Sequence, residues 1–322
     1  MKVIDMHCDT IMKLYQAKKE GRPYTLRDSD GQLSLTGMKQ GDYLLQNFAM
    51  FVYMNGSMDP YQTCHEMMDV FDEQMAANAD LILPVRNSAE IEAAEKQGKM
   101  AALLTIEEGG VCQGSLAKLQ EFYDRGARMM TLTWNFENEI GWPAAIAKDA
   151  VDKEAMGLKP FGIECVQRME ALGMIVDVSH LSDAGFYDVC KYTKAPFVAS
   201  HSDARALCGH QRNLTDDMIH LLAERGGVTG LNYCGSFLRD EGCNPATLER
   251  IVAHAKHIAN VGGIECLGLG SDFDGISNAV EMKDASGMQM LADALQKGGF
   301  TASETEKIFS KNVLRVYREV LK

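Results

Sequence analysis

Short apolar runs alternate with amphipathic helical segments along the chain, and this alternation constrains the fold more than any other feature. It is typical of parallel strands that are joined by crossover helices. Eight apolar runs are predicted as strands: Val3–Met6, Gln46–Val52, Met100–Thr105, Arg128–Leu132, Met174–Val178, Phe197–Ala199, Val228–Leu231 and Leu267–Gly270. Segments with a 3.6-residue period are predicted as helices between them: Met58–Ala79, Ser115–Arg125, Phe161–Leu172, Asp216–Glu224 and Pro245–Val261.

Eight strand–helix units favour a closed (β/α)8 barrel of the TIM type over an open doubly wound sheet. No G-x-G-x-x-G motif follows an early strand, which also argues against a nucleotide-binding sheet. A length of 322 residues is within the range of one such barrel, and no Pro-, Gly- or Ser-rich linker divides the chain. We therefore predict an α/β protein with one barrel domain over residues 1–322, whose active site lies at the C-terminal ends of the strands.

The composition argues against several classes of partner. The net charge of −13 makes the average surface repel nucleic acid and anionic membranes. No apolar stretch approaches the ~18 residues of a membrane-spanning helix, and Met1-Lys2-Val3 leads into the first apolar run without a signal-peptide core. The nine cysteines are scattered as singles, which is typical of reduced thiols in a cytosol. We expect a cytoplasmic protein with no nucleic-acid partner and no membrane anchor.

The first apolar run ends in His7-Cys8-Asp9. Side chains two residues apart in an extended segment point the same way, so the imidazole and the carboxylate can bind one cation together. Cys8 should then point to the opposite face as a small buried residue. If this motif stood alone, a core histidine and a turn aspartate would be the better explanation of it.

Four further runs change that balance, because each also ends in a ligand-type residue. The C-terminal ends of barrel strands converge on one mouth, so these groups should meet there. Carboxylates brought together raise one another's pKa by repulsion, and a divalent metal removes that cost while it uses neutral imidazoles as ligands. The residues in question are Glu107 and Glu108, His180, His201, and Asp272 and Asp274.

The number of candidate ligands predicts two metal ions rather than one. His7 and Asp9 can bind one ion, His180 and His201 can bind the other, and Glu107 is placed to bridge them. Mixed imidazole and carboxylate ligands suit zinc best, with manganese or iron as alternatives. Such a pair of ions would deprotonate a shared water and polarise a carbonyl group.

The chain resembles a known family, the membrane (renal-type) dipeptidases. This family is the zinc dipeptidase branch of the amidohydrolase superfamily. The matching stretches occur in the family's order and span nearly the whole chain. They are Ile4-Asp5-Met6-His7-Cys8-Asp9, Thr105-Ile106-Glu107-Glu108-Gly109-Gly110, Asp177-Val178-Ser179-His180, Ser200-His201-Ser202, Arg212-Asn213 and Gly268-Leu269-Gly270-Ser271-Asp272-Phe273-Asp274-Gly275.

The resemblance implies a binuclear zinc barrel that hydrolyses dipeptides with a water held between the two ions, and it suggests a homodimer. It implies that His7 and Asp9 bind one zinc, that Glu107 bridges, and that His180 and His201 bind the second. It also implies that Arg212 holds the substrate carboxylate and that Asp272 handles protons or the substrate amine. The family tolerates a D-residue at the C-terminal position, so L-D dipeptides from cell-wall turnover are expected substrates.

The residues themselves support the last two roles less strongly. Arg offers a planar fork for a carboxylate, and Arg212 follows His201 by eleven residues in a polar loop, so it can reach the same mouth. A solvated surface arginine explains Arg212 equally well without the family. Asp272 and Asp274 both stand at a strand-to-loop turn, where either could be a turn residue, and spacing alone does not choose between them.

One position departs from the family pattern. The mammalian members carry a substrate-contacting His after the fourth strand, and gapless extension from Glu107 places Trp134 there. Its indole offers one N–H donor and does not ionise. Asn135, Asn138 or the metal ions could compensate, and we count Trp134 and Asn135 as candidate substrate-binding residues. The departure bears on efficiency and substrate range more than on metal binding.

Two other functions remain open. A barrel hydrolase of another substrate, such as a lactone, a phosphotriester or a cyclic amide, is one alternative. Relatives of that kind commonly bridge their metals with a carboxylated lysine on the fourth strand, and Thr131-Leu132-Thr133-Trp134 contains no lysine. The other alternative is a metal-binding protein that has lost turnover through Trp134.

Overall fold

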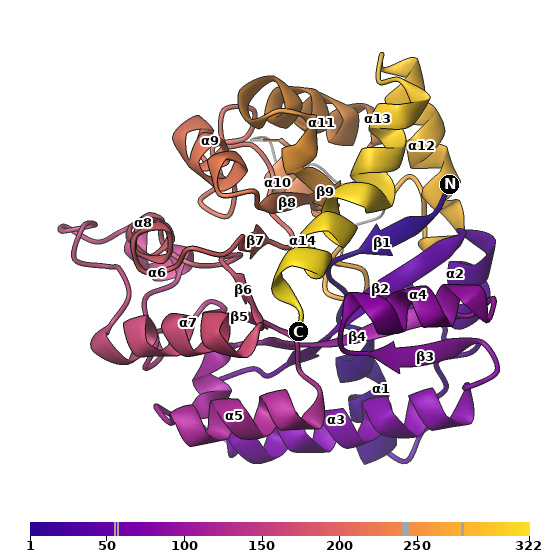
Figure 1. Cartoon of the computed structure of the whole chain (residues 1–322), viewed down its shortest axis with the longest axis horizontal. Helices are drawn as coiled ribbons and strands as arrows, with labels where there is room; N and C mark the ends of the chain where they lie inside the picture. Colours follow the sequence, from indigo (N-terminus) through magenta and orange to yellow (C-terminus); the bar gives the residue numbers. More distant parts are fainter. Residues whose placement is uncertain (55, 57, 240–244, 278–279) are drawn as a thin grey trace.

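A closed ring of eight parallel strands forms the centre of the computed structural model, which describes residues 1–54, 56, 58–239, 245–277 and 280–322 (Figure 1). The ring closes where Leu45–Phe51 of one strand pair with Ala101–Glu107 of another. The predicted (β/α)8 barrel is therefore confirmed. The strands of the sheet are β1 (Val3–Asp5), β2 (Tyr43–Phe51), β3 (Ile82–Val85), β4 (Met100–Glu107), β5 (Met129–Thr131), β6 (Ile175–Asp177), β7 (Val198–Ala199), β8 (Val228–Leu231) and β9 (Leu267–Leu269).

Helices surround the ring and connect its strands. The α-helices are α1 (Thr10–Lys19), α2 (Leu35–Gln40), α3 (Pro60–Ala77), α4 (Ser88–Lys96), α5 (Leu116–Arg125), α6 (Ala144–Ala147), α7 (Pro160–Leu172), α8 (Asp183–Tyr192), α9 (Asp216–Glu224), α10 (Gly235–Leu238), α11 (Leu248–Gly262), α12 (Met288–Lys297), α13 (Ala302–Glu306) and α14 (Asn312–Val320). Short 3-10 turns are η1 (Gly109–Cys112), η2 (Ile264–Cys266) and η3 (Ala285–Gly287), and η4 (Lys307–Lys311) is a π-helical turn.

The period of two residues along a strand decides what enters the barrel. In β4, Ala101 and Leu103 belong to the buried cluster inside the ring, whereas Leu104 and Ile106 belong to the cluster beneath the helices. Glu107 is separated from Leu103 by four residues, so it points into the ring on the same face. The strand's alternation therefore carries a carboxylate to the top of an apolar barrel.

The opposite end of the barrel is closed by α14. Its buried residues Val313, Val316 and Tyr317 pack with Ile4, Leu45 and other inward residues at the base of the ring. The Tyr317 hydroxyl donates to Asn47 Oδ1 at 2.9 Å, deep inside. In Figure 1, α14 lies across the centre of the ring. The base is therefore filled, and the other end is left for chemistry.

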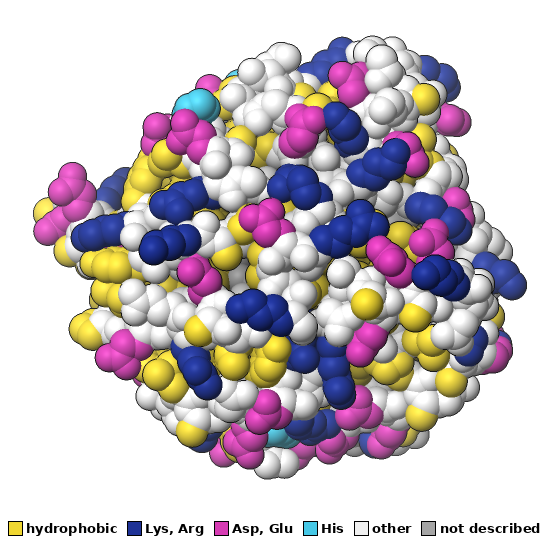
Figure 2. Space-filling model, in the orientation of Figure 1, with side chains coloured by type: hydrophobic (Ala, Val, Ile, Leu, Met, Phe, Trp, Pro, Cys, Tyr) yellow, Lys and Arg dark blue, Asp and Glu magenta, His cyan; other side chains and the backbone are white. Residues whose placement is uncertain are grey.

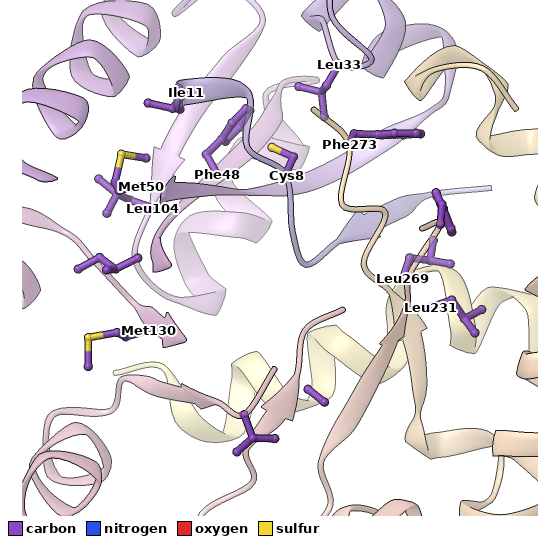
Figure 3. Packing of buried hydrophobic residues seen from close by; sticks show 14 of the residues in the cluster. Cys8, Ile11, Leu33, Phe48, Met50, Leu104, Met130, Leu231, Leu269 and Phe273 are labelled. Atoms are coloured by element: carbon purple, nitrogen blue, oxygen red, sulfur yellow. The ribbon is translucent and has the colours of Figure 1, made fainter. Parts of the chain in front are cut away.

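The larger hydrophobic cluster lies between the strands and the surrounding helices. Figure 3 shows Cys8, Phe48 and Ile11 within it, close to the start of α1. Cys8 is fully buried and its thiol faces Asn47 O at 3.4 Å, on the opposite side of the chain from the imidazole of His7. Cys243 lies outside the described residues, and the cysteines that the structure describes are all free thiols.

The sequence missed some elements and placed others well. Each of the eight predicted runs overlaps a strand of the ring, but β2 begins before its predicted run and β4 ends after its own. β3 was not predicted; it pairs only with the first half of β4, outside the ring. Gly126 and Gly173 end α5 and α7 in the left-handed region, which glycine adopts without steric cost. The Thr301–Glu304 capping box also opens α13.

The surface carries charges of both signs. On the face shown in Figure 2, the basic and acidic side chains are interspersed. Among the described residues, no helix combines the length and the apolar character needed to cross a bilayer.

Candidate metal centre and active site

Five strand ends bring imidazoles and carboxylates to one point above the ring. His7 follows β1, Glu107 ends β4, and His180, His201 and Asp272 follow β6, β7 and β9. All but Asp272 are at most 9% exposed, and the side chain of Asp272 is 14% exposed. The rings of His7 and His201 stack with their centroids 3.9 Å apart. The convergence predicted from the sequence is therefore what the structure contains.

Glu107 lies between two groups of imidazoles. Its Oε2 is 3.2 Å from His7 Nε2, while its Oε1 is 3.1 Å from His180 Nε2 and 3.7 Å from His201 Nε2. Each carboxylate oxygen thus faces a different partner group. This is the geometry that a carboxylate needs to bridge two cations.

Asp9 and Asp272 complete the side of the site that holds His7. Their carboxylate oxygens lie 3.6 and 3.9 Å from His7 Nε2. One ligand atom from each of His7, Asp9 and Asp272 falls within a 4.8 Å group, and so does one from each of His7, Glu107 and His201. These distances are short enough for a single ion to be shared within each group.

Several buried polar atoms here make no hydrogen bond within the described part of the chain. Among the described residues, neither ring nitrogen of His7 nor Oδ1 of Asp9 makes a hydrogen bond. His180 Nε2 and His201 Nε2 lie only 3.1 Å apart. Because unpaired buried polar atoms are costly, a donor set of three imidazoles and several carboxylates fits a divalent cation such as zinc.

The electrostatics of the site reflect this crowding. Burial raises the pKa of Glu107 to about 8 and that of Asp272 to about 6. Burial also lowers the pKa of His180 and His201 well below the usual range. For His7, burial is outweighed by the nearby Glu107 and Asp9 charges, and its pKa rises. A bound divalent cation would favour ionised carboxylates and neutral imidazoles instead.

Outer hydrogen bonds orient two of the imidazoles. His201 Nδ1 lies 2.7 Å from Ser200 Oγ, and this hydroxyl in turn donates to Asp177 Oδ2 at 2.6 Å. The hydroxyl has a single proton, so Nδ1 of His201 must donate to it, and Nε2 is left with its lone pair toward the site. His180 Nδ1 similarly faces Asn135 Oδ1 at 3.1 Å. Asp177 and Ser200 were not assigned roles from the sequence, since a carboxylate inside an apolar run and a lone serine carry no ligand spacing.

The backbone is strained at two of these positions. His180 and Asp272 have φ angles of 69° and 61°, a left-handed region that costs non-glycine residues energy. Strain of this kind persists where the surrounding structure over-determines a conformation, and it clusters at functional sites.

The two candidate aspartates after β9 are separated by their contacts. Asp274 accepts from Thr10 Oγ1 at 2.7 Å, from Lys13 Nζ at 2.9 Å and from Gln32 N at 2.8 Å. Asp272 faces the cavity, with Oδ1 near His7 and Oδ2 accepting from Asn232 Nδ2 at 3.0 Å. Asp274 therefore ties the loops together, and Asp272 is the one available for chemistry.

Arg212 is a buried cation without an anion. It is 5% exposed, and its guanidinium makes two long hydrogen bonds, to Ser202 Oγ at 3.3 Å and His201 O at 3.4 Å. In the described part of the chain no carboxylate lies within ion-pair distance of it, and its Nε has no hydrogen-bond partner. Because a buried unpaired charge is expensive, this site is suited to an anionic ligand.

A cavity of about 250 Å³ opens above these groups. It is small compared with pockets for drug-sized ligands, which begin near ~300 Å³. A larger cavity of about 340 Å³ near α6 and α8 contains none of the converging imidazoles. The smaller cavity is lined by Asp9, Met12, Phe51, Glu107, Trp134, Asn135, His180, Arg212, Cys234, Phe237, Asp272, Gly275, Ile276 and Ser277.

Trp134 and Asn135 both line this cavity, as the candidates for substrate binding should. Asn135 also bonds His180, which the sequence did not predict. Glu108, next to Glu107, is fully buried; it accepts hydrogen bonds from Trp134 N at 3.0 Å, from Gly110 N at 2.8 Å and from the Asn138 side chain. It therefore anchors the loop that carries both candidates.

Two known proteins are similar to this chain in sequence. An uncharacterized dipeptidase of Schizosaccharomyces pombe is 33% identical over 298 residues, which cover 88% of this chain and 71% of its own. An uncharacterized protein from the pqqA 5' region of Klebsiella pneumoniae is 32% identical over 264 residues, covering 81% of this chain and 97% of its own.

Solved structures agree along the whole length. A metallopeptidase named dipeptidase AC superposes with a TM-score of 0.90 at 26% identity, covering 100% of this chain and 99% of its own. A metallopeptidase from Rhodobacter sphaeroides, crystallised with a phosphinate mimic of L-Ala-D-Ala, shares the fold with a TM-score of 0.90 at 24% identity, covering 99% of each chain. The family model described as membrane dipeptidase (peptidase family M19) matches residues 1–322. Taken with the strand-end imidazoles and carboxylates, this match means that the chain belongs to the membrane dipeptidase family, peptidase family M19.

Proposed function

We propose that the chain is a metal-dependent dipeptidase that holds two zinc ions and hydrolyses free dipeptides, including L-D dipeptides. Membership of the M19 family supports the metallo-dipeptidase activity itself. The observation that carries the two-ion proposal is Glu107, whose two oxygens face different imidazoles at 3.2 and 3.1 Å. We further propose that residues 1–322 act as one catalytic domain.

This geometry supports two ligand sets. His7 and Asp9 would hold one ion, His180 and His201 the other, and Glu107 both. Ions held by these residues would supply a low-pKa water as nucleophile and would polarise the scissile carbonyl. The imidazole and carboxylate donors support zinc over magnesium or calcium, which prefer oxygen ligands alone.

The chain's own residues orient the substrate and move the proton. Arg212 binds the free carboxylate of the dipeptide, since its buried guanidinium has no anionic partner among the described residues and a planar fork suits that group. Asp272, held by Asn232 and facing His7, transfers a proton toward the leaving amine. A substrate without a nearby free carboxylate cannot satisfy Arg212, so longer peptides should be poor substrates.

The test is a hydrolysis assay on the zinc-loaded chain with L-L and L-D dipeptides, each beside its C-terminal amide. Loss of a buried charge partner costs several kcal/mol, so we expect kcat/KM for the amides to be lower by about 100-fold or more. Equal turnover of acids and amides would refute the carboxylate clamp. Turnover of L-L dipeptides alone would refute the L-D proposal.

Two variants, one control variant and one alternative substrate complete the experiment. Glu107→Gln should abolish turnover, because the amide cannot place an anionic oxygen toward each ion. Arg212→Gln should remove the difference between acids and amides. Arg318→Gln, on α14, removes the same charge from an exposed ion pair with Glu92 of α4 and should change neither result. A lactone in the same panel tests for a barrel hydrolase of another class.

The homodimer and the cytoplasmic location stay predictions.

A further inference from the structure

Four aromatic side chains form one continuous surface at the edge of the active-site cavity. Trp134 is at its centre, with ring centroids 4.9 Å from Phe51, 5.5 Å from Tyr53 and 5.7 Å from Phe136. We call these four residues the aromatic wall. Trp134 and Phe51 line the cavity, and Tyr53 is 47% exposed. Large aromatic faces left open beside a reaction site offer apolar contact to a ligand.

The aromatic wall is held in place from below. The backbone N–H of Trp134 donates to the fully buried Glu108, which also accepts from Gly110 and Asn138. The carbonyl oxygen of the Asn138 side chain accepts from Ile140 N at 2.7 Å and Gly141 N at 3.1 Å, which fixes the far end of the loop. The indole therefore stands on a preorganised loop, and a ligand need not order it on binding.

The aromatic wall and Arg212 lie on different sides of the cavity. Phe51 is the register partner of Glu107 between β2 and β4, and Trp134 follows β5, which pairs with the other edge of β4. Arg212 is bonded to the residues that follow β7 and stacks over Phe237, which follows β8. In the closed strand order β8 lies across the ring from β4 (Figure 1).

This arrangement gives the substrate a direction, if the function proposed above holds. A dipeptide carboxylate on Arg212 and a scissile carbonyl at Glu107 place the C-terminal residue between those two groups. The N-terminal residue then lies beyond Glu107, on the side of β2 and β5. Its side chain meets Phe51 and Trp134.

We propose that the aromatic wall binds the side chain of the N-terminal residue and selects dipeptides in which that residue is large and apolar or aromatic. The gain from apolar contact in such a pocket corresponds to about 10- to 200-fold in kcat/KM for modest differences in side-chain size. The inference rests on the proposed function, which it deepens by naming the substrate class.

The first experiment measures kcat/KM on the zinc-loaded chain for Gly-Ala, Leu-Ala and Phe-Ala. We expect Phe-Ala to exceed Gly-Ala by at least about tenfold. Trp134→Ala should lower that ratio by about fivefold or more, and Trp134→Phe should keep most of it. Trp142→Ala removes the other tryptophan, which does not line the cavity, and should leave the ratio as in the wild type. Zinc content of each variant checks that the metal centre is intact.

A second substrate series separates the two ends of the dipeptide. Trp134→Ala should leave the ratio of Ala-Phe to Ala-Gly unchanged, because the aromatic wall faces the N-terminal residue. A Phe-Ala to Gly-Ala ratio near one in the wild type would overturn the proposal. So would a Trp134→Ala effect confined to the Ala-Phe series.

A binding measurement keeps the inference distinct from the proposed function. Calorimetry compares phosphinate dipeptide analogues with a benzyl group or a hydrogen at the N-terminal side-chain position. Tighter binding of the benzyl analogue that is lost in Trp134→Ala supports the aromatic wall, even if no dipeptide is hydrolysed and the proposed function fails. Equal binding of the two analogues overturns the aromatic wall, even where dipeptides are hydrolysed.

Discussion

The Ser200 hydroxyl donates to Asp177 at 2.6 Å, and this bond determines which nitrogen of the neighbouring His201 carries a proton. Both carboxylate oxygens of Asp177 accept hydrogen bonds, because Thr131 Oγ1 and the backbone N–H groups of Ser179 and Ser200 also donate to it. The carboxylate is thus a fixed acceptor beneath the metal centre. Outer-shell partners of this kind orient imidazole ligands and raise their basicity.

Ser200→Ala should weaken zinc binding by about 10- to 100-fold, because His201 loses the acceptor that holds its ring and tautomer. Competition with a chelating dye measures the affinity. Ser303→Ala, at an exposed position on α13, removes the same hydroxyl where it contacts no ligand. Unchanged zinc affinity in Ser200→Ala would remove the hydroxyl from any role in positioning His201.

Asp272→Asn and Asp274→Asn should separate catalysis from stability. Asp272 faces the cavity, so the Asp272→Asn variant should lose most of the wild-type kcat with little change in unfolding free energy. Asp274 joins Thr10, Lys13 and Gln32, so its amide should cost about 1–3 kcal/mol of stability. Chemical denaturation and steady-state kinetics measure the two quantities. The reverse pattern, with Asp274→Asn inactive and stable, would exchange the two assignments.

Zinc should stabilise the folded chain in addition to supporting hydrolysis. Removing it leaves His7, Asp9 and Glu107 crowded and partly without partners. By linkage, free zinc at 1,000 times its Kd adds about 4 kcal/mol to the unfolding free energy. Thermal melts of the chelated chain should rise on adding zinc and respond far less to magnesium. A melting temperature indifferent to zinc would contradict a site formed by these residues.

His254 should make the fold sensitive to acid. Its Nδ1 accepts from Ala204 N at 3.1 Å and its Nε2 faces Leu238 O at 3.2 Å, which requires the neutral ring, and burial lowers its pKa to about 4. The unfolded chain takes up a proton near pH 6.5, so the stabilisation is complete above that pH. It is lost as the pH falls toward 4, by about 3 kcal/mol.

Urea denaturation of wild type and His254→Gln between pH 7 and 4 measures this term. The glutamine cannot titrate, so the difference in stability between the two proteins should shrink as the pH falls. Parallel pH profiles for wild type and His254→Gln would exclude His254 as the acid-sensitive group.

The sequence predicted the barrel because parallel barrel strands are buried apolar runs that alternate with helical segments. It also predicted that imidazoles and carboxylates converge at one end of the barrel, because these residues follow those runs. It missed β3, in which Leu83 is partly exposed and Pro84 is exposed, since such a strand at an edge has neither continuous burial nor clean alternation. It missed α2, a six-residue helix capped by Ser34 within a stretch rich in Gly and Asp.

At the candidate site, sequence-based prediction is limited by contacts between residues far apart in the chain. Spacing could not separate Asp272 from Asp274, because the distinction lies in which of them meets Thr10 and Lys13, residues more than 250 positions earlier. Nor could it find that Asn135 bonds His180 across 45 residues. These are tertiary contacts, and no local pattern encodes them.

The sealing of the barrel base by α14 has a consequence for how the chain acquires its structure. Tyr317 and Asn47 bond across 270 residues, so the first strands cannot bury their inner faces until the final helix has left the ribosome. Contacts of such long range slow folding and leave apolar surface open meanwhile. Synthesis of this protein should therefore depend on chaperones that shield the nascent half-barrel, and a premature stop before residue 312 should yield aggregate rather than a smaller enzyme.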